Sequence, residues 1–325
     1  MPLYPTLVSN TKTRWDAHLY LFLANLIYGV SFTIAKDIIP HYIQPYGAIF
    51  IRATGALILF TLSWLIFIRE KIQRRDLVLL ITCGFFGVAA NQLLFFKGLS
   101  MTTPINAALI MVTTPILVVV IAALTGKDKI TLPKVIGIAL GVSGAVTIVA
   151  SGKELSFGSE HLLGDLCVFL NAASYAVYLV IVKPLMHRYN PVTVITFVFF
   201  FGWLLIIPVG WQQFTVADYN SFPNHIWWEL GFIVIGTTFL AYLFNILALR
   251  HASSSVAGAY IYAQPVLAVL FAFAMKSLGW NVEAHYGWMH FVATIMIFTG
   301  VYLVSFAGTK KQPAHEAELE NTLNE

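Results

Sequence analysis

The sequence predicts an all-α integral membrane protein with ten transmembrane helices in two inverted five-helix repeats. The composition, ten long apolar segments and an internal repeat support this prediction. Of the 325 residues, 58% are hydrophobic and only 10% are charged, and the mean hydropathy is +0.79. Soluble proteins are about 45–50% apolar and about 25% charged. A soluble domain of this length cannot bury so much apolar surface, so the composition excludes a soluble enzyme or binding domain.

Ten segments are long and apolar enough to cross the hydrocarbon core, which takes about 17–25 residues of α-helix. In the first half of the chain they are residues 17–35, 48–68, 77–96, 106–124 and 132–150. In the second half they are residues 162–182, 192–209, 228–249, 256–275 and 286–306. The connections between them are short and leave no room for a soluble catalytic domain. We therefore expect no enzyme activity from this chain.

The basic residues predict the orientation, because Lys and Arg near helix ends stay in the cytoplasm. With the amino terminus inside, 14 of the 19 Lys and Arg residues fall on the inner side and 5 on the outer side. We expect residues 1–16 to be a cytoplasmic segment and residues 307–325 to be a disordered cytoplasmic tail. Since the basic residues lie between apolar segments, the net charge of +4 indicates a lipid bilayer as the partner and not a nucleic acid.

Around the fourth and ninth apolar segments, the two halves of the chain repeat at an offset of 150 residues. This offset matches Ala107 with Ala257, Pro115 with Pro265, Leu117 with Leu267, Val119 with Val269 and Ala122 with Ala272. We expect one repeat in residues 17–150 and a second in residues 151–306. Because five helices per repeat is an odd number, the second repeat must enter the bilayer in the opposite direction. Many secondary transporters share this inverted topology.

Polar residues near the middle of the apolar segments predict a binding site, since polar groups in hydrocarbon are costly. Pro115 and Pro265 lie at the centres of their segments and lack an N–H, so we expect them to break the helices and to act in gating. The candidate substrate-binding residues are Asn25, Tyr28, Asn91, Gln92, Thr113, Thr114, Asn171, Tyr175, Tyr242, Tyr260 and Gln264. We expect this set to line a central cavity. Each residue alone also fits an ordinary contact between helices, which is common and modest in energy.

Arg52 is the one strong charge within a predicted span, near its outer end. It either extends to the membrane interface or attracts anionic groups from an outer vestibule. No Asp or Glu lies in the middle of any span, so the sequence gives no support for tight proton coupling. The two cysteines, Cys83 and Cys167, lie in apolar runs. We therefore expect no metal site, and the sequence suggests no cofactor.

These residues resemble the EamA family of the drug/metabolite transporter superfamily over residues 19–306. The segment NLIYGVSFTIAKDII from Asn25 is similar to that family's first helix, and Arg52 falls where the family commonly carries an arginine. NQLLFFKGLSMTTPINAALIMVTTPILVVVIAAL from Asn91 resembles its third and fourth helices. YIYAQPVLAVLFAF resembles its ninth helix, and IGIALGVSGAVTIV its fifth.

The resemblance implies a ten-helix transporter in the bacterial inner membrane that works by alternating access. This chain departs from the family pattern at one place, which affects the residue roles that the resemblance implies. The family often has a Glu just after helices four and nine, where this chain reads TGKDK and SLGWN. Asp128 is an imperfect substitute for that Glu.

The sequence therefore favours a secondary transporter that exports a small polar or amphipathic metabolite, amino acid-like, or a drug. Two alternatives stay open. The first is a membrane receptor or scaffold that does not transport. The second is an intramembrane hydrolase, since Gly141-Val142-Ser143-Gly144 resembles the nucleophile motif of rhomboid proteases. A hydrolase needs a base beside the serine, and His290 is the only remotely suitable one. The oligomeric state, monomer or homodimer, also stays open.

Overall fold

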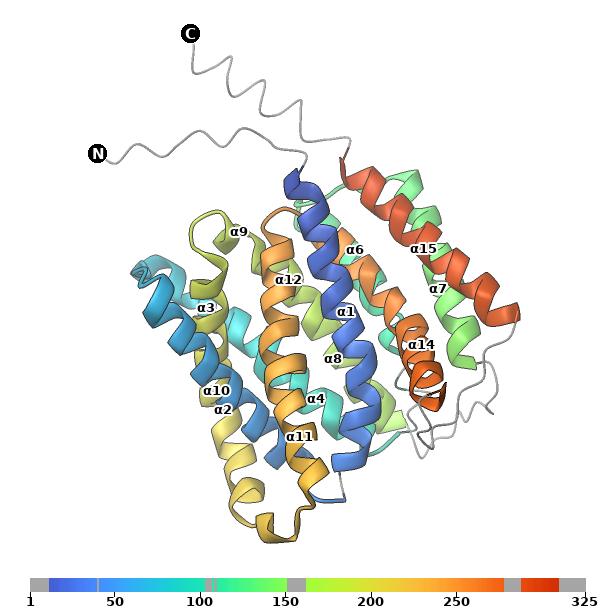
Figure 1. Cartoon of the computed structure of the whole chain (residues 1–325). Coiled ribbons are helices and arrows are strands. Elements are labelled where there is room, and N and C mark those ends of the chain that lie inside the picture. Colours follow the sequence, from blue (N-terminus) through green and yellow to red (C-terminus); the bar gives the residue numbers. More distant parts are fainter. Residues whose placement is uncertain are drawn as a thin grey trace. The chain divides into compact units, whose positions relative to one another are not determined.

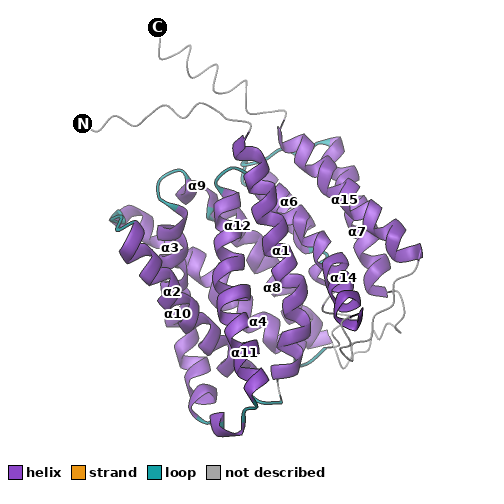
Figure 2. Ribbon diagram, viewed as in Figure 1, coloured by secondary structure: helices purple, strands orange, loops and turns teal. Residues whose placement is uncertain are grey.

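The computed structural model describes residues 12–39, 41–102, 107, 110–150, 162–277 and 288–309. These residues form helices joined by turns, and no β-strand occurs among them (Figure 2). The prediction of an all-α protein is confirmed. Most of the two predicted terminal segments, residues 1–11 and 310–325, lies outside the described residues.

The chain forms two compact units, and each takes stretches from both halves of the sequence. Unit 1 comprises Met1–Gly84 and Val182–Ala252, and unit 2 comprises Phe85–Ile181 and Ser253–Glu325. In unit 1 the helices are α1 (Lys12–Ile38), α2 (Pro45–Phe67), η1 (Arg74–Asp76), α3 (Leu77–Gly84), α9 (Lys183–Met186), α10 (Pro191–Thr215), η4 (Tyr219–Ser221), α11 (Asn224–Phe232), η5 (Ile233–Leu240) and α12 (Ala241–Leu249) (Figure 1). In unit 2 they are η2 (Phe85–Ala89), α4 (Ala90–Leu99), α6 (Thr114–Leu124), α7 (Leu132–Ala150), α8 (Leu162–Ile181), α13 (Ser254–Ala259), η6 (Tyr260–Tyr262), α14 (Ala263–Ser277) and α15 (Trp288–Thr309).

The described residues of the ten predicted segments are helical, except for turns or bends at Ile68, Val112, Thr113 and Val182. Five helices are long and apolar enough to cross a membrane: Pro45–Phe67, Arg74–Leu99, Leu162–Met186, Pro191–Thr215 and Asn224–Leu249. Three of these five are composite. Arg74–Leu99 joins η1, α3, η2 and α4, Leu162–Met186 joins α8 and α9, and Asn224–Leu249 joins α11, η5 and α12. A count of ten membrane spans stays a prediction.

Several helices begin at local sequence signals. Pro191 occupies the first turn of α10, where its missing N–H costs nothing, and the Asn190 side chain accepts a bond from the N–H of Val192 (3.0 Å). The helix α2 lacks a side-chain cap of its own. Instead, Gln213 from α10 accepts bonds from the N–H groups of Tyr46 (2.8 Å) and Gly47 (3.2 Å). The start of α2 is therefore stabilised by tertiary structure.

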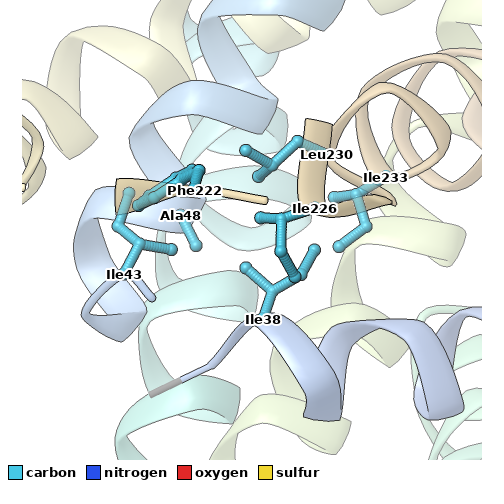
Figure 3. Close-up of a cluster of buried hydrophobic side chains, with 7 residues drawn as sticks. All are labelled: Ile38, Ile43, Ala48, Phe222, Ile226, Leu230 and Ile233. Atoms are coloured by element: carbon cyan, nitrogen blue, oxygen red, sulfur yellow. The ribbon is translucent and has the colours of Figure 1, made fainter. Parts of the chain in front are cut away.

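Unit 1 is held together by close packing of α2 on α10 and by an apolar cluster. A methyl group at Gly210 would lie 2.7 Å from the Cβ of Phe50, so only glycine permits the approach. Near the start of α2, apolar side chains from α1, α2, α11 and the turns between helices meet (Figure 3). The cluster contains Ile38, Ile43, Ala48, Phe222, Ile226, Leu230 and Ile233. It joins the turn after α1 to the turn before α11.

Unit 2 is held together by backbone contact between α7 and α15. A methyl group at Gly137 would lie 2.7 Å from the carbonyl oxygen of Gly300, and one at Gly300 would lie 2.5 Å from the carbonyl oxygen of Gly137. At Gly144 it would lie 2.7 Å from the carbonyl oxygen of Ala293. Small residues of this kind let helices approach in membranes, where van der Waals packing drives association.

The spatial units differ from the sequence repeats. The second helices of the two repeats, α2 and α10, pack together in unit 1, and the fifth helices, α7 and α15, pack together in unit 2. The first helix of one repeat packs on the third helix of the other in both units, as α1 on α12 and as α8 on α4. The same pairing rule thus operates twice, as expected for two copies of one five-helix pattern.

Candidate functional site

Two apolar helices are interrupted just before their prolines. In the first repeat, residues 112 and 113 form a turn, and α6 begins at Thr114 with Pro115 in its first turn. In the second repeat, the 3₁₀ turn η6 separates α13 from α14, and Pro265 lies in the first turn of α14. The offset of 150 residues that the sequence shows relates the two breaks. Backbone that leaves the α-helix is the usual place for binding sites within membrane helices.

Two π-helices form a second pair of irregularities, which the sequence analysis missed. They are η2 (Phe85–Ala89) and η5 (Ile233–Leu240). The helices that contain them, Arg74–Leu99 and Asn224–Leu249, begin and end 150 residues apart, which places residues 85–89 onto residues 235–239, inside η5. Well under 1% of residues in proteins are π-helical, and such turns concentrate at functional sites. Both repeats therefore carry the same rare backbone feature in their third helix.

In unit 2, two side chains from α8 bond to the backbone of the helix that contains η2. The amide nitrogen of Asn171 donates to the carbonyl oxygen of Asn91 (2.6 Å). The hydroxyl of Ser174 donates to the carbonyl oxygen of Phe86 (2.7 Å). Since residues three apart lie on one face of a helix, α8 presents a polar face to this backbone. Asn171 and Asn91 were predicted from the sequence, whereas Ser174 was missed although its spacing from Asn171 points to it.

Several buried polar atoms in unit 2 have no hydrogen-bond partner among the described residues. Both amide atoms of Gln92, which is 3% exposed, belong to this group. So do Oδ1 of Asn171 and the hydroxyl oxygen of Thr114, whose residue is 0% exposed. The buried hydroxyl of Tyr262 belongs to this group as well. A buried polar group without a partner costs about 1–3 kcal/mol, so a ligand or water that bonds to these atoms would be favoured.

The other predicted residues of unit 2 lie near the two helix breaks or on α8. The hydroxyl of Thr113 donates to the carbonyl oxygen of Ile110 (2.7 Å), within its own turn. Tyr260 and Gln264 are partly buried on either side of the second break. The ring of Tyr175 lies 6.0 Å from that of Tyr178. Thr113, Tyr260 and Gln264 thus flank the two breaks along the chain, whereas Tyr175 lies on α8.

In unit 1, Arg52 bonds to the second π-helix. Its Nε donates to the hydroxyl oxygen of Thr238 (3.0 Å), and that hydroxyl donates to the carbonyl oxygen of Ile233 (2.7 Å). In the same unit, the rings of Tyr28 and Tyr242 meet edge to face at 6.3 Å. Thr238 was not predicted, although the Thr-Thr pair in the middle of an apolar run was a signal for it.

Asn25 lies in the same unit and is 2% exposed. Its amide nitrogen donates to the carbonyl oxygen of Leu21 (2.7 Å), one turn earlier in α1. The predicted residues thus divide between the units: Asn25, Tyr28, Arg52 and Tyr242 are in unit 1, and the others are in unit 2. A single central cavity lined by both sets stays a prediction.

Asp128, in the turn after α6, joins three segments of unit 2. Its carboxylate forms an ion pair with Lys134, which is 1% exposed, and accepts a bond from the hydroxyl of Ser255 (2.6 Å). Lys134 also donates to the carbonyl oxygen of Lys129 (3.1 Å). The carboxylate therefore links the turn after α6 to the starts of α7 and α13.

A second charged cluster lies in unit 1, where α9 meets the end of α12. The ammonium of Lys183 donates to the carbonyl oxygens of Leu249 (2.6 Å) and Ala252, at a helix terminus that favours cations. Burial lowers the pKa of His187, and the charges of Lys183 and Arg250 lower it further. Burial and the same two charges also lower the pKa of His251. Both imidazoles therefore favour the neutral form.

The hydrolase motif serves helix packing in this fold. A methyl group at Gly141 would lie 2.3 Å from the ring of Tyr262, and Gly144 contacts α15. Ser143, between these glycines, is exposed, and the side chain of His290 lies outside the described residues. Among the residues that the structure describes, no three His, Cys, Asp or Glu side chains gather where they could hold a metal ion.

Comparison with known proteins assigns the family. The EamA-like transporter family matches residues 15–150 and 162–306. The uncharacterized transporter YyaM of Bacillus subtilis (strain 168) is 24% identical over 305 residues, which cover 91% of this chain and 98% of that protein. A probable terminal-alkyne amino-acid exporter of Streptantibioticus cattleyicolor is 25% identical over 204 residues, which cover 62% of this chain and 66% of that protein.

The fold has a counterpart among solved structures as well. A crystal structure with 19% sequence identity matches with a TM-score of 0.73 and covers 92% of this chain and 99% of its own. At that identity the likeness concerns the fold alone. The family match, in contrast, extends over both halves of the sequence and agrees with the apolar helices. This chain therefore belongs to the EamA-like transporter family.

Proposed function

We propose that this multi-pass membrane protein exports a small polar or amphipathic metabolite, amino acid-like, or a drug from a bacterial cell by alternating access. The proposal includes the inner membrane as its location, both termini in the cytoplasm, and an inverted orientation of residues 17–150 and 151–306. The excess of Lys and Arg on one side of the predicted spans supports the orientation. A reporter fused after Glu325 that is active only in the cytoplasm tests it.

The buried amide of Gln92 carries the proposal. Both of its polar atoms lack a partner among the described residues, and the same holds for Oδ1 of Asn171 and the hydroxyl of Thr114. Their combined cost of several kcal/mol lowers stability in a chain that could carry an apolar residue at each place. Proteins tolerate such losses mainly at functional sites. A polar solute that supplies the missing hydrogen bonds explains why these residues are present.

The chemistry of this set favours an uncharged polar recognition surface. Amides donate and accept, and hydroxyls do both, so the residues complement a solute that carries donors and acceptors. An amino acid-like solute fits, and the relative from Streptantibioticus cattleyicolor that is named as an amino-acid exporter supports the same class. A drug with polar groups on an apolar body is the second candidate, because Tyr175 lies one turn after Asn171 in α8 and Tyr260 lies at the second helix break.

The test removes the amide without making a cavity. Gln92→Met has a similar volume and leaves no unpaired polar atom, so we expect the protein to stay folded and to be at least as stable as wild type. Export should fall at least about tenfold, since about 1.4 kcal/mol of lost interaction is a factor of 10. The measurement is mass spectrometry of the medium and the cytosol from bacteria that express each variant at equal membrane levels.

Thr193→Val is the matched control. Thr193 is 0% exposed, and its hydroxyl also lacks a partner among the described residues, but it lies on α10, which carries none of the predicted residues. Its replacement should leave export unchanged. Solutes exported equally by wild type and Gln92→Met would overturn the site. No exported solute beyond the empty vector, under varied growth conditions, would overturn export and favour import or a receptor that does not transport.

A further inference from the structure

The chain passes between the two units at three places, and one of them lies at the start of a π-helix. The passages are at Gly84–Phe85, Ile181–Val182 and Ala252–Ser253. The second falls at the bend between α8 and α9, within the apolar helix Leu162–Met186, and the third falls just before α13. The first falls inside the continuous helix Arg74–Leu99, at the residue where α3 ends and the π-helix η2 begins. This membrane helix therefore belongs to both units.

Each side of this junction is fixed within its own unit by a glycine. A methyl group at Gly84 would lie 2.9 Å from the carbonyl oxygen of Val198 and 2.9 Å from the backbone nitrogen of Gly202, both on α10 in unit 1. A methyl group at Gly87 would lie 2.5 Å from the ring of Tyr178, on α8 in unit 2. Two residues thus separate a contact to unit 1 from a contact to unit 2. Any movement between the units must be absorbed in this turn or at the two other passages.

A hydrogen bond from α8 acts on this same turn. Ser174 is 4% exposed, and its hydroxyl donates to the carbonyl oxygen of Phe86, inside η2 (2.7 Å). The bond from Asn171 to the carbonyl oxygen of Asn91 lies one turn further on. Polar side chains that bond backbone carbonyls are able to stabilise a helix irregularity. The π turn is therefore supported from unit 2.

The equivalent helix of the second repeat also contains a π-helix whose backbone is bonded by a polar side chain. The π-helix η5 lies at the repeat offset from η2, and Thr238 bonds the carbonyl oxygen of Ile233 within it (2.7 Å). Arg52 supports that threonine from α2 (3.0 Å). A π-helix that arose by chance in one helix would not be expected to occur again, with its own polar side-chain contacts, in the equivalent helix of the other repeat.

We propose that η2 is a hinge of the transport cycle, where the backbone changes between π and α hydrogen bonding, and that Ser174 is the positioning residue that holds the π form. A π turn closes i→i+5 bonds where an α turn closes i→i+4 bonds. Their exchange turns the following segment by about one residue, which is about 100° and about 1.5 Å along the axis. Two discrete hydrogen-bond patterns make a bistable element of the kind that hinges require. The inference deepens the proposed function and rests on it for its role in transport.

The first test deletes Val88 from the π turn. The deletion lets the turn close as α-helix while both flanks keep their faces, so we expect a folded protein that has lost the exchange. Spin labels at Asn220→Cys in unit 1 and Ser100→Cys in unit 2, both exposed, report the distance between the units by electron–electron double resonance. The protein is the full chain in lipid nanodiscs with Cys83→Ala and Cys167→Ala. We expect a broad distance distribution that narrows in the deletion variant.

Two controls isolate the effect. Labels at Ser100→Cys and Ser277→Cys lie within unit 2 and should give the same distribution with and without Val88. Deletion of Leu59 from the regular helix α2 turns the rest of that helix by about 100° and should abolish folding. The hinge is overturned if deletion of Val88 leaves the distribution between the units unchanged. It is also overturned if the distribution narrows but the solute identified by mass spectrometry is still exported.

A second variant tests the role of Ser174 if the deletion variant does not fold. Ser174→Ala removes the hydroxyl, and amide hydrogen exchange in residues 84–92 should quicken by about tenfold, the factor that about 1.4 kcal/mol represents. Ser174→Thr keeps a hydroxyl and should restore slow exchange. Thr196→Val is the control, since Thr196 donates to the carbonyl oxygen of Phe60 in the regular helix α2 (3.2 Å). Unchanged exchange in Ser174→Ala would refute the positioning role. A wild type that exports no solute would defeat the proposed function and leave these distance and exchange results standing.

Discussion

The buried ion pair of unit 2 allows a quantitative prediction for Asp128→Asn. The ammonium of Lys134 lies in a side chain that is 2% exposed, and it bonds to the carboxylate of Asp128 and to the carbonyl oxygen of Lys129 (3.1 Å). Asparagine keeps an oxygen that accepts from Ser255, so the substitution removes mainly the negative charge. The cation of Lys134 is then left buried without its partner.

The expected loss in the free energy of unfolding is about 3 kcal/mol. Removal of one partner from a buried ion pair costs about 3–5 kcal/mol. The Asp128 side chain is 21% exposed, so water screens the pair partly and the lower end of the range applies. The reverse change, Lys134→Met, should cost only about 1 kcal/mol, because Asp128 keeps Ser255 (2.6 Å) and the backbone N–H of Lys129 (2.8 Å) as donors.

The assay is the thermal unfolding midpoint of the purified full chain in detergent. At about 2 °C per kcal/mol for a chain of this size, Asp128→Asn should lower the midpoint by about 6 °C. The double variant Asp128→Asn with Lys134→Met removes both charges and should return most of the loss. Lys129→Met, an exposed lysine next to the pair, changes the net charge alone and should shift stability by less than about 0.5 kcal/mol. The reasoning fails if the double variant is as unstable as Asp128→Asn.

Three further results are expected. Gly141→Ala puts a methyl group 2.3 Å from an aromatic ring and should cost about 1–3 kcal/mol of stability in thermal unfolding. Gly231→Ala, in a helix where a methyl group would have nothing within 4 Å, should be neutral or stabilising. Equal losses in the two variants would contradict the packing argument. In a double-mutant cycle, Thr238→Val and Arg52→Lys should couple by about 0.5–1.5 kcal/mol through the bond between them, and strict additivity would show that the bond contributes nothing. The pKa of His251 lies below its ordinary value of 6.5, so the contribution of this residue to stability is complete above pH 6.5 and is lost as the pH falls toward the lowered pKa. The variant His251→Gln should therefore show a smaller decline of the unfolding midpoint between about pH 7 and pH 5. A decline of the same slope as in wild type would exclude this histidine as its cause.

Much of the fold could be predicted because its signals are local in the sequence. Apolar runs of membrane length predict helices, since backbone polar groups in hydrocarbon must bond within the same segment. The helix breaks before Pro115 and Pro265 follow from the missing proline N–H and from a clash with the preceding turn. The repeat could be found because its two copies keep the same spacing of prolines and small residues. For these features no knowledge of contacts between helices was needed.

The polar contacts could be predicted only in part. Gln92, Asn171 and Thr114 stood out, because an amide or hydroxyl in an apolar run is conspicuous. Ser174 and Thr238 did not, because serine and threonine often bond to their own helix backbone and are inconspicuous in membrane segments. Their partners lie 88 and 186 positions away in the chain. The sequence contains no signal that identifies which distant carbonyl or guanidinium they meet.

Tertiary structure alone decided how the helices are grouped. The sequence divides the chain into two repeats, whereas the folded units take helices from both. An apolar helix suits lipid and protein about equally, because lipid tails are as apolar as a helix neighbour, so hydropathy cannot select its partner. Glycines such as Gly84 and Gly137 select it, through backbone approach that only the partner's surface defines. The π turns likewise depend on contacts from α8 and α2, since the local sequence alone favours the α-helix with its shorter hydrogen-bonded ring.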